Sequence, residues 1–487
     1  MKLSELLRDI EVLEMAASPD LEIGGVCYDS RNVKPGDLFV AITGYETDGH
    51  IYIPKAVAQG AQVVICEKVP EMDIPYVRVA STRKALAVLG ANWFGHPADA
   101  MTMIGVTGTN GKTSTTVILK SVLEQTLGAK VGLVGTIQNM IGDEIIPTER
   151  TTPESFELQS LFAQMRDAGC THVVMEVSSH ALYLNRVDCV QFRVGAFTNL
   201  TEDHLDFHKT MEEYRKAKAI LFRHCDIGVF NIDDPAVKAT IQEASCEVVT
   251  CSEHPEGADF CADNIVLHAD RVEMDVTHRG ETAKISIGIP GIFTVYNTLS
   301  VISCAVSLGI PLQKVAEALK NAKGVKGRVE VVPTEGQDFT VLIDYAHTPD
   351  ALENVLKSVR GFCKGRVIAL FGCGGDRDPI KRPIMGKIGV DYADFVVYTS
   401  DNPRTEDPNA ILQQVVAGAE GTNTPYHVEE NRRAAIRWAM DHAEKDDIIV
   451  LAGKGHETYQ IIGKEKTHLD EREEVAAHLL TMKERNG

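Results

Sequence analysis

The chain has 487 residues, of which 44% are apolar, so it can bury the two or three hydrophobic cores that a chain of this length usually needs. Its 49 Lys and Arg residues face 69 Asp and Glu residues, which gives a formal net charge of −20. Because so acidic a surface repels phosphate backbones and anionic lipids, the composition argues against a general nucleic-acid binder and against a binder of anionic membranes. Any anionic ligand must therefore meet local positive charge.

The sequence shows no feature that predicts export or membrane insertion. Residues 1–9 contain neither a long apolar core nor a small-residue cleavage site, and no later stretch reaches the roughly 18 apolar residues of a membrane span. The 11 cysteines are scattered and include no C-x-x-C pair, which favours reduced core thiols over disulfides or zinc ligands. We therefore expect a cytoplasmic protein with no nucleic-acid partner, no membrane insertion and no evident obligate protein partner.

The character of the sequence changes near residues 95–98 and 324–328, which predicts three domains over residues 1–98, 99–327 and 328–487. In the first domain, residues 37–42 and 61–66 are predicted strands, with a helix over 52–60 between them. In the second domain, short apolar runs alternate with helical stretches at 102–107, 130–134, 172–177, 195–198 and 227–231. The third domain shows the same alternation, with apolar runs at 340–344, 366–371, 395–399 and 448–451. The alternation predicts an α/β fold of mostly parallel sheets, with a small N-terminal domain, a central P-loop ATPase-like domain and a Rossmann-like C-terminal domain.

The segment over residues 104–123 is typical of a strand, a phosphate loop and a helix. Gly108 and Gly111 let the backbone approach a polyphosphate, Lys112 supplies a positive charge, and Thr113 offers a hydroxyl to a magnesium ion. Only two residues separate the glycines, where the common loop has four, so the spacing predicts a particular subclass of nucleotide-binding proteins. The alternative is an ordinary glycine-rich turn before a helix.

Three further elements follow predicted strands of the central domain. Glu176 ends one strand, where a magnesium ligand would belong, although a strand-end charge near solvent is the alternative. Residues 199–208 are a dense cluster of acids and imidazoles that could bind metal, position phosphate or be a solvated loop. Lys218 lies in a predicted helix over 214–222, and a lysine there is ordinarily a solvated surface cation.

Together, residues 108–113, 176–180, 199–206 and 214–218 closely resemble motifs of the Mur ligases, ATP-dependent amide-forming enzymes of peptidoglycan synthesis. The resemblance extends through the whole chain. Residues 29–31, 33–40 and 48–50 resemble the family's UDP-binding first domain, and residues 296–297, 327–328 and 344–349 resemble its nucleotide-contacting elements. Residues 372–377, 401–404 and 453–457 resemble its amino-acid site.

The resemblance implies the following site residues. ATP is expected at Gly108, Thr109, Asn110, Gly111, Lys112, Thr113, Ser114, Asn297 and Arg328, and the UDP-muramoyl-dipeptide at Ser30, Thr151, Thr152, Ser178 and Arg186. Diaminopimelate is expected at Arg377, Asp401, Asn402, Pro403, Arg404, Gly453 and Glu457. Mg²⁺ ions are expected at Thr113, Glu176, His204 and Lys218, the last as a carbamate, and catalytic roles at Lys112, Lys218, Asp344 and His347. Leu184 departs from the pattern, since some relatives have a glutamine there.

The reaction that the resemblance implies joins meso-diaminopimelate to UDP-N-acetylmuramoyl-L-alanyl-D-glutamate at the expense of ATP, through an acyl phosphate. The box Asp-Asn-Pro-Arg over residues 401–404 discriminates best, because a guanidinium can bind the distant carboxylate that diaminopimelate has and lysine lacks. A simple Asn-Pro turn with solvated charges is the alternative for this box.

Two other functions compete with this hypothesis. A folylpolyglutamate synthetase shares the loop and the acyl-phosphate chemistry, but residues 29–31 resemble a UDP-binding domain that such an enzyme lacks. A nucleotide-dependent switch would need no amino-acid pocket, so Arg377, Arg404 and Glu457 argue against it.

Overall fold

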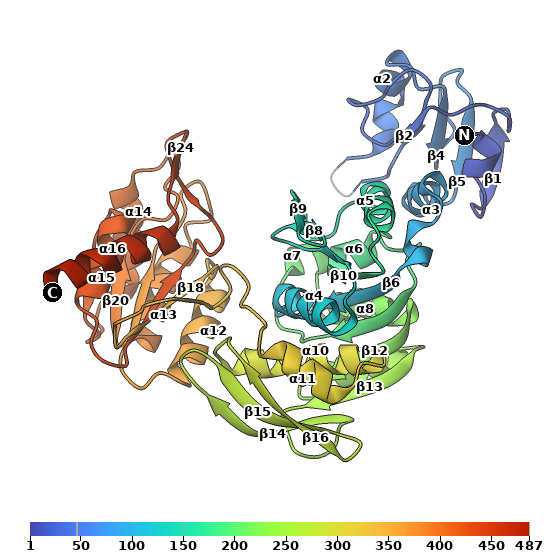
Figure 1. The fold of residues 1–487 in the computed structure, drawn as a ribbon. Helices are drawn as coiled ribbons and strands as arrows, with labels where there is room; N and C mark the ends of the chain where they lie inside the picture. The colour runs from blue at the N-terminus through green and yellow to red at the C-terminus, as the bar shows by residue number, and fades with distance from the viewer. Residues whose placement is uncertain (45–46, 149, 487) are drawn as a thin grey trace. The chain divides into compact units, whose positions relative to one another are not determined.

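The computed structural model describes residues 1–44, 47–148 and 150–486 (Figure 1). Contacts divide the chain into two compact units, Met1–Cys251 with Ser303–Ile310, and Ser252–Ile302 with Pro311–Gly487. Three large sheets with helices between their strands follow one another along the described chain, so the fold is the three-domain α/β fold that the sequence predicts. The exact domain boundaries at residues 98 and 327 stay predictions.

The first sheet has five strands in the order β1-β5-β4-β3-β2. They are β1 (Val12–Ala16), β2 (Gly25–Cys27), β3 (Asp37–Val40), β4 (Val63–Cys66) and β5 (Tyr76–Val79). Strands β2 to β5 run parallel, and β1 joins β5 antiparallel at the edge. Helix α2 (Ile53–Ala58) lies between β3 and β4 in the chain, whereas α3 (Thr82–Phe94) follows β5. Helix α3 begins where the Ser81 side chain accepts from the amide of Lys84, and it ends at the left-handed Gly95.

The central sheet of the first unit has the neighbour order β13-β12-β11-β6-β10-β7-β8-β9. Its strands are β6 (Thr102–Thr107), β7 (Val131–Val134), β8 (Asn139–Ile141), β9 (Glu144–Ile146), β10 (His172–Glu176), β11 (Phe192–Phe197), β12 (Cys225–Asn231) and β13 (Glu247–Ser252). Strands β13 to β7 run parallel, whereas β8 and β9 continue antiparallel. The helices between them are α4 (Lys112–Leu127), α5 (Ser155–Asp167), α6 (Ser179–Tyr183), α7 (Leu205–His208), α8 (Met211–Ala219) and α9 (Val237–Glu243).

The chain changes direction across this sheet at β6. Leaving β6, it passes to β7 and returns to β10 on one side, and then crosses to β11 on the other side. In open α/β sheets, ligands bind beyond the carboxyl ends of the strands at such a point. The loops after β10, β6 and β11 are therefore the expected ligand-binding edge of the first unit.

The second unit contains an antiparallel meander and a larger parallel sheet. The meander is β14 (Phe260–Leu267), β15 (Val272–His278) and β16 (Glu281–Ile287). It is followed by α10 (Ile292–Ser307), whose residues from Ser303 onward belong to the first unit, and by α11 (Leu312–Leu319). The larger sheet has the order β17-β18-β22-β19-β20-β21, in which only β17 runs antiparallel. Its strands are β17 (Glu330–Val332), β18 (Thr340–Asp344), β19 (Val367–Phe371), β20 (Phe395–Tyr398), β21 (Tyr426–Val428) and β22 (Ile448–Ala452).

Helices and one hairpin complete the C-terminal sheet. The helices are α12 (Pro349–Arg360), α13 (Lys381–Tyr392), α14 (Pro408–Val416), α15 (Arg432–Asp441) and α16 (Glu471–Asn486), and the hairpin is β23 (Tyr459–Ile462) with β24 (Glu465–His468). Leu352, Val359 and Met385 from the helices pack with β-strand residues in one core, and Ile436 and Val475 belong to another core of this domain. The parallel strands carry almost continuous buried apolar residues, because helices cover the sheet.

The predicted strands of the parallel sheets are all present, with ends that differ by up to three residues. The predicted strands over 102–107 and 340–344 are β6 and β18 with the same bounds. The meander β14 to β16 and the hairpin β23–β24 were not predicted, although β15 alternates buried and half-buried residues as a half-exposed strand does. Within residues 1–44, 47–148 and 150–486, every helix is too short or too polar to cross a bilayer.

Candidate functional site

The predicted phosphate loop joins β6 to α4 in the first unit. Gly108 (φ 146°) and Gly111 (φ 84°) both have positive φ, and a Cβ on Gly108 would lie 1.9 Å from the hydroxyl oxygen of Thr198. Position 108 therefore requires glycine. Residues 112–114 form the first turn of α4, and the N-terminus of a helix carries a partial positive charge that attracts phosphate.

The segment after β11 holds this loop in place. Asn199 Oδ1 accepts a hydrogen bond from the Asn110 amide at 2.9 Å, and the Asn199 carbonyl accepts one from the Thr109 amide at 2.9 Å. Thr198 Oγ1 donates to the Asn110 carbonyl at 2.6 Å. Contacts between two loops at neighbouring strand ends thus fix the backbone that would surround a phosphate.

Two lysine side chains converge on the Gly108 carbonyl. Lys112 Nζ lies 2.9 Å from this oxygen and Lys218 Nζ lies 2.7 Å from it. Lys218 is only 1% exposed. Burial, and then repulsion from Lys112, lowers the pKa of Lys218 well below its usual value. The reading of Lys218 as a solvated surface cation is therefore wrong, because α8 packs this side chain against the phosphate loop.

Glu176 ends β10, next to β6, and is 1% exposed. Thr136 donates to both of its carboxylate oxygens, from the amide to Oε1 at 2.9 Å and from the hydroxyl to Oε2 at 3.0 Å. The alternative of a strand-end charge near solvent is thus wrong. Glu176 is a buried, oriented carboxylate at the same sheet edge as the phosphate loop.

His204 precedes α7 in the loop that follows β11, and its side chain is about half exposed. Its Nε2 lies 3.3 Å from Asp203 Oδ2, and its ring packs edge-on against His180 at 4.9 Å between centroids. The four predicted metal ligands belong to elements at or beside the carboxyl ends of β10, β6 and β11. They are Thr113, Glu176, His204 and Lys218.

The donor set at this edge fits magnesium better than a metal that requires an all-protein cage. The described residues contain no group of three or more His, Cys, Asp or Glu side chains that could hold a metal ion. Mg²⁺ typically takes one or two carboxylates and completes its shell with waters and substrate phosphates. A single buried carboxylate, Glu176, with the hydroxyl of Thr113 beside a phosphate loop, matches that requirement.

The residues predicted to hold the muramoyl-dipeptide form one hydrogen-bonded group with Glu176. Thr152 Oγ1 donates to the Glu176 carbonyl at 2.9 Å and accepts from the Ser178 amide at 3.2 Å. Arg186 Nη1 donates to the Thr152 carbonyl at 3.0 Å. Thr151 Oγ1 lies 3.0 Å from Thr136 Oγ1, so this group reaches the threonine that orients Glu176.

A cavity of about 1290 Å³ opens beside this group, within the first unit. Its walls include Ser30 and other residues of the 24–55 region, together with Arg150, Leu184 and Arg186 of the central domain. The volume exceeds the roughly 300–1,000 Å³ of a typical small-molecule pocket, which suits a long ligand. Leu184, the departure noted in the sequence, presents an apolar side chain to this cavity.

Sequence reasoning selected Arg186 but missed two further arginines on the wall of this cavity, Arg83 and Arg150. Arg83, Arg150 and Arg186 approach the buried carboxylate of Glu154, with N–O distances of 3.7, 3.7 and 3.2 Å. Three guanidinium groups against one carboxylate leave positive charge for an anionic ligand. Arg150 and Glu154 flank the predicted Thr151 and Thr152, so their position in the sequence could have indicated that they belong to the site. Arg83 lies in α3, away from every motif quoted from the sequence.

In the second unit, Asp344 organises the segment that resembles the family's nucleotide-contacting elements. Its Oδ2 accepts from the Val329 amide and its Oδ1 from the Ala346 amide, each at 2.8 Å. Burial raises the pKa of this carboxyl above its usual value. The guanidinium of Arg328 lies 5.2 Å from the ring centroid of Tyr345.

The two other predicted residues of this group differ in exposure. The His347 side chain is exposed, and its Nδ1 lies 2.8 Å from the Tyr345 carbonyl oxygen. Asn297 is buried on α10. Position alone gives neither residue a chemical role.

Arg377 and Arg404 project from two adjacent loops of the C-terminal sheet. Arg404 Nη1 donates to the Gly375 carbonyl at 2.7 Å, and Arg377 Nη1 donates to the Asp376 carbonyl at 3.2 Å. The Arg404 backbone (φ 51°) is left-handed and is fixed by its amide, which donates to the Ile461 carbonyl at 3.1 Å. A guanidinium has five N–H donors, so an arginine anchored by one carbonyl can still bind a carboxylate.

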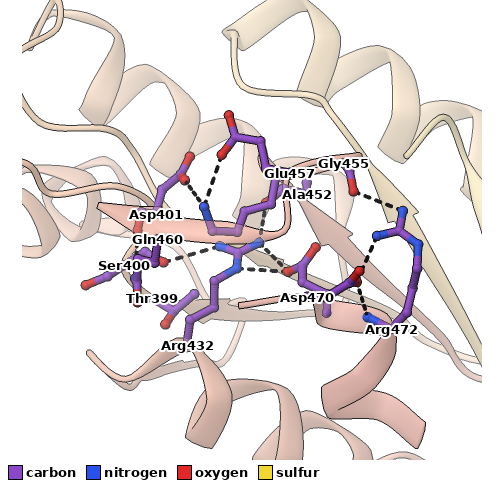
Figure 2. Close-up of polar contacts among 12 residues, drawn as sticks. Thr399, Ser400, Asp401, Arg432, Ala452, Gly455, Glu457, Gln460, Asp470 and Arg472 are labelled. Carbon is purple, nitrogen blue, oxygen red and sulfur yellow. Dashed lines mark hydrogen bonds and ion pairs between the residues drawn. The ribbon is translucent and has the colours of Figure 1, made fainter. Parts of the chain in front are cut away.

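The loops after β20 and β22 bring together Asp401, Asn402 and Glu457. Asn402 Nδ2 donates to Glu457 Oε2 at 3.0 Å. Figure 2 shows the carboxylates of Asp401 and Glu457 near one another. The ammonium of Lys454 lies 3.2 Å from each of these carboxylates. The alternative of a simple Asn-Pro turn with solvated charges is wrong, because Asp401 and Asn402 are buried in this cluster. Sequence reasoning selected Gly453 and Glu457 from this motif and missed the lysine between them.

Three family models match the chain. They are described as Mur ligase family, catalytic domain, over residues 22–99, Mur ligase middle domain over residues 106–305, and Mur ligase, glutamate ligase domain, over residues 327–455.

Individual relatives match over nearly the full length. The UDP-N-acetylmuramoyl-L-alanyl-D-glutamate–2,6-diaminopimelate ligase 1 of Clostridium acetobutylicum is 48% identical over 98% of both chains. The ligase of that name from Caldanaerobacter subterraneus subsp. tengcongensis is 49% identical, also over 98% of both chains. A solved structure of a UDP-N-acetylmuramoyl-L-alanyl-D-glutamate–2,6-diaminopimelate ligase has a TM-score of 0.76 and 29% identity, over 99% of both chains.

Proposed function

The chain belongs to the Mur ligase family, and on that premise we propose that it is an ATP-dependent ligase that joins meso-diaminopimelate to UDP-N-acetylmuramoyl-L-alanyl-D-glutamate. The reaction is a step in the synthesis of peptidoglycan precursors and takes place in the cytoplasm. One structural observation supports the choice of amino acid. Arg404 follows Pro403 and the buried Asp401–Asn402 pair, and this pair is linked to Glu457 both directly, from Asn402 Nδ2, and through the Lys454 ammonium.

The chemistry requires that a carboxylate be activated before an amine attacks it. Transfer of the γ-phosphoryl group of ATP to the substrate carboxylate forms an acyl phosphate and releases ADP. The amine then attacks the acyl carbon, and inorganic phosphate leaves with the bonding electron pair. Both steps gather negative charge, so the protein contributes mainly positioning and positive charge.

Lys112 and the first turn of α4 supply that charge at the phosphate loop. The loop amides and the partial positive charge of the helix N-terminus hold the transferred phosphoryl group, and Lys112 offsets its charge. Thr113 and Glu176 would hold one magnesium ion, and His204 with Lys218 a second. Magnesium, when bound, supplies electrostatic stabilisation of the phosphate oxygens.

Lys218 serves this site as a carbamate. An ammonium group cannot ligate a cation, whereas addition of its amine nitrogen to carbon dioxide, with loss of one proton, gives an anionic oxygen ligand. Its burial beside the Gly108 carbonyl supports this assignment. Isotopically labelled carbon dioxide should give a carbamate carbon signal that the Lys218→Arg variant lacks.

The cavity of the first unit is the site of the UDP-muramoyl-dipeptide. Ser30 lies on the nucleotide side, and Thr151, Thr152, Ser178 and Arg186 lie in the hydrogen-bonded group that leads to Glu176. The positive charge of Arg83, Arg150 and Arg186 suits the phosphates and carboxylates of that ligand. Asp344 shapes the segment that contacts nucleotide, through its two backbone hydrogen bonds.

The decisive experiment measures release of inorganic phosphate with each acceptor set. We expect release only when ATP, the UDP-muramoyl-dipeptide and meso-diaminopimelate are all present, with a product that has gained one diaminopimelate residue by mass. L-Lysine in place of diaminopimelate should give little product.

The other candidate functions give different results in the same assay. Release with a folate and glutamate would identify a folylpolyglutamate synthetase. Release that no acceptor stimulates would identify a nucleotide-dependent switch. Either result would overturn the proposed function.

A further inference from the structure

Lys454 is a fully buried cation in the middle of the proposed amino-acid site, and the reaction itself assigns it no role. Its exposed fraction is 0%. Its ammonium lies 3.2 Å from Asp401 Oδ1, 3.1 Å from Asn402 Oδ1 and 3.2 Å from Glu457 Oε2. These three acceptors come from two loops, the one after β20 and the one after β22.

The number of donors decides what Lys454 can do. A lysine ammonium has three N–H donors and no acceptor. Three acceptors within hydrogen-bond distance can take all three donors, so the side chain has no donor left for a substrate group. Lys454 is therefore placed to act through its neighbours.

The hydrogen bonds of Glu457 and Asn402 orient both side chains and leave one carboxylate oxygen of Glu457 available to a ligand. Both contacts to Glu457 use Oε2, from Lys454 and from Asn402 Nδ2, which leaves Oε1 as the atom that can accept from a ligand ammonium. Asn402 Oδ1 accepts from Lys454 and from the Ile461 amide at 3.0 Å, so its amide group is fixed in one orientation. Two carboxylates and one ammonium leave a net charge of −1, which favours a cationic amino group.

A separate buried arginine holds the backbone of the same loops. Figure 2 shows Arg432 pointing at the backbone of Ser400 and Ala452, the residues just before Asp401 and Gly453. It donates to the Ser400 carbonyl at 3.3 Å and to the Ala452 carbonyl at 2.8 Å, and pairs with Glu471 at 2.7 Å. Arg432 thus binds the backbone of the two loops, whereas Lys454 binds the side chains of Asp401, Asn402 and Glu457.

We propose that Lys454 is a positioning residue for amino-acid recognition, which holds Glu457 and Asn402 in the orientation that binds the amino group of diaminopimelate. This inference rests on the proposed function. It places specificity in a residue that contacts the ligand only through Glu457 and Asn402.

The test compares steady-state kinetics of wild type and Lys454→Met for all three substrates. Loss of the charged contacts should raise the KM for diaminopimelate about 10- to 100-fold and leave kcat much less affected. The KM values for ATP and for the UDP-muramoyl-dipeptide should stay near wild type, because their proposed residues lie elsewhere. Lys445→Met, at an exposed lysine of the same unit, is the matched control and should behave as wild type.

A double-mutant cycle with Glu457→Gln separates positioning from direct contact and from a purely structural role. If Lys454 acts through Glu457, adding Lys454→Met to Glu457→Gln should cost far less than it does in wild type. Additive effects, an unchanged KM for diaminopimelate, or a parallel rise of all three KM values would overturn the inference. If Lys454→Met does not fold, Lys454→Gln tests the same point, since it keeps an N–H donor and loses the charge.

The outcome is distinguishable from failure of the proposed function. If wild type does not use diaminopimelate at all, the proposed function fails. If wild type uses it and Lys454→Met retains the wild-type KM, only the role of Lys454 fails.

Discussion

At the scale of single residues, burial separates Lys218 and Lys454 from ordinary surface lysines. Lys218 and Lys454 are 1% and 0% exposed, and each lies against backbone or side-chain oxygens of a predicted site. A charged side chain without water must be paired, so its position is fixed by those partners. The side chains of both lysines are therefore held in fixed positions, and neither serves as a solvent-exposed charge that aids solubility.

Arg404 is expected to decide which amino acid the enzyme accepts. Arg404→Ala removes the guanidinium, so the kcat/KM for diaminopimelate should fall about 10- to 100-fold, the value of one or two hydrogen bonds to a charged group. The discrimination against L-lysine should fall in parallel, as measured by competition between the two amino acids. Arg437→Ala, at a half-exposed arginine paired with Glu474, is the control. Unchanged discrimination in Arg404→Ala would refute the assignment.

At the scale of elements, the loops at the carboxyl ends of parallel strands carry the proposed chemistry in both units. The phosphate loop follows β6, and the loop containing Asn199 and His204 follows β11. In the C-terminal sheet, Asp401 follows β20 and Gly453 follows β22. Parallel strands end at one edge of a sheet, so their loops meet there and can share ligands.

Gly108→Ala should weaken nucleotide binding strongly without unfolding the chain. The positive φ and the 1.9 Å approach of a Cβ to Thr198 Oγ1 force the loop to move. We expect the ATP affinity, measured by calorimetry, to fall more than about tenfold, and the circular dichroism spectrum to be retained. Gly128→Ala is a matched control at the other end of α4, where positive φ also occurs but a Cβ meets nothing within 4 Å. Equal ATP affinity in the two variants would contradict the strained-loop explanation.

Asp447 stabilises the C-terminal sheet in a pH-dependent way. Its buried carboxylate accepts from Arg366 Nη2 at 2.7 Å and from the Glu444 amide at 2.8 Å, which joins the starts of β19 and β22. Burial raises the pKa of this carboxyl, but these hydrogen bonds outweigh burial, and the net pKa lies below its usual value. The folded state then binds fewer protons than the unfolded state, so this stabilisation is complete above the unfolded pKa, about 4, and is lost as the pH falls through the folded pKa.

Asp447→Asn should therefore lower the free energy of unfolding by about 2–3 kcal/mol at neutral pH, and by less below about pH 4. Denaturant titration followed by the fluorescence of Trp438, in a Trp93→Phe background, reports on the C-terminal domain alone. Asp391→Asn, at a partly exposed carboxylate paired with Lys387, should change little at either pH. A cost for Asp447→Asn that is independent of pH would contradict the carboxylate explanation.

At the scale of the whole molecule, the proposed ligands are distributed over both units. The phosphate loop and the cavity belong to the first unit, whereas Asn297, Arg328 and the amino-acid loops belong to the second. The hydrophobic cores of both units consist of packed apolar side chains, and burial of such side chains is the main favourable contribution to folding.

Removal of divalent metal should therefore stop the reaction and leave the fold intact. We expect a chelator to abolish phosphate release, added Mg²⁺ to restore it, and the thermal unfolding curve to change little in the chelator. Glu176→Gln should raise the Mg²⁺ concentration for half-maximal rate, because an amide is a weaker ligand than a carboxylate. Full activity in the chelator would remove magnesium from the mechanism.

The sequence by itself determined the parallel strands, the phosphate loop and the family, because these depend on local apolar runs and on motifs whose residues are close along the chain. The alternation of buried and half-buried residues in β15 is also a local pattern of this kind. Only the tertiary structure decided which charged side chains are buried. Lys218 meets Gly108 across 110 residues and Lys454 meets Asp401 across 53 residues, and such pairs leave no local pattern. The burial of a charged side chain and the identity of its hydrogen-bond partners determine its chemical properties. Both are set by elements that are distant in the sequence and pack against that side chain.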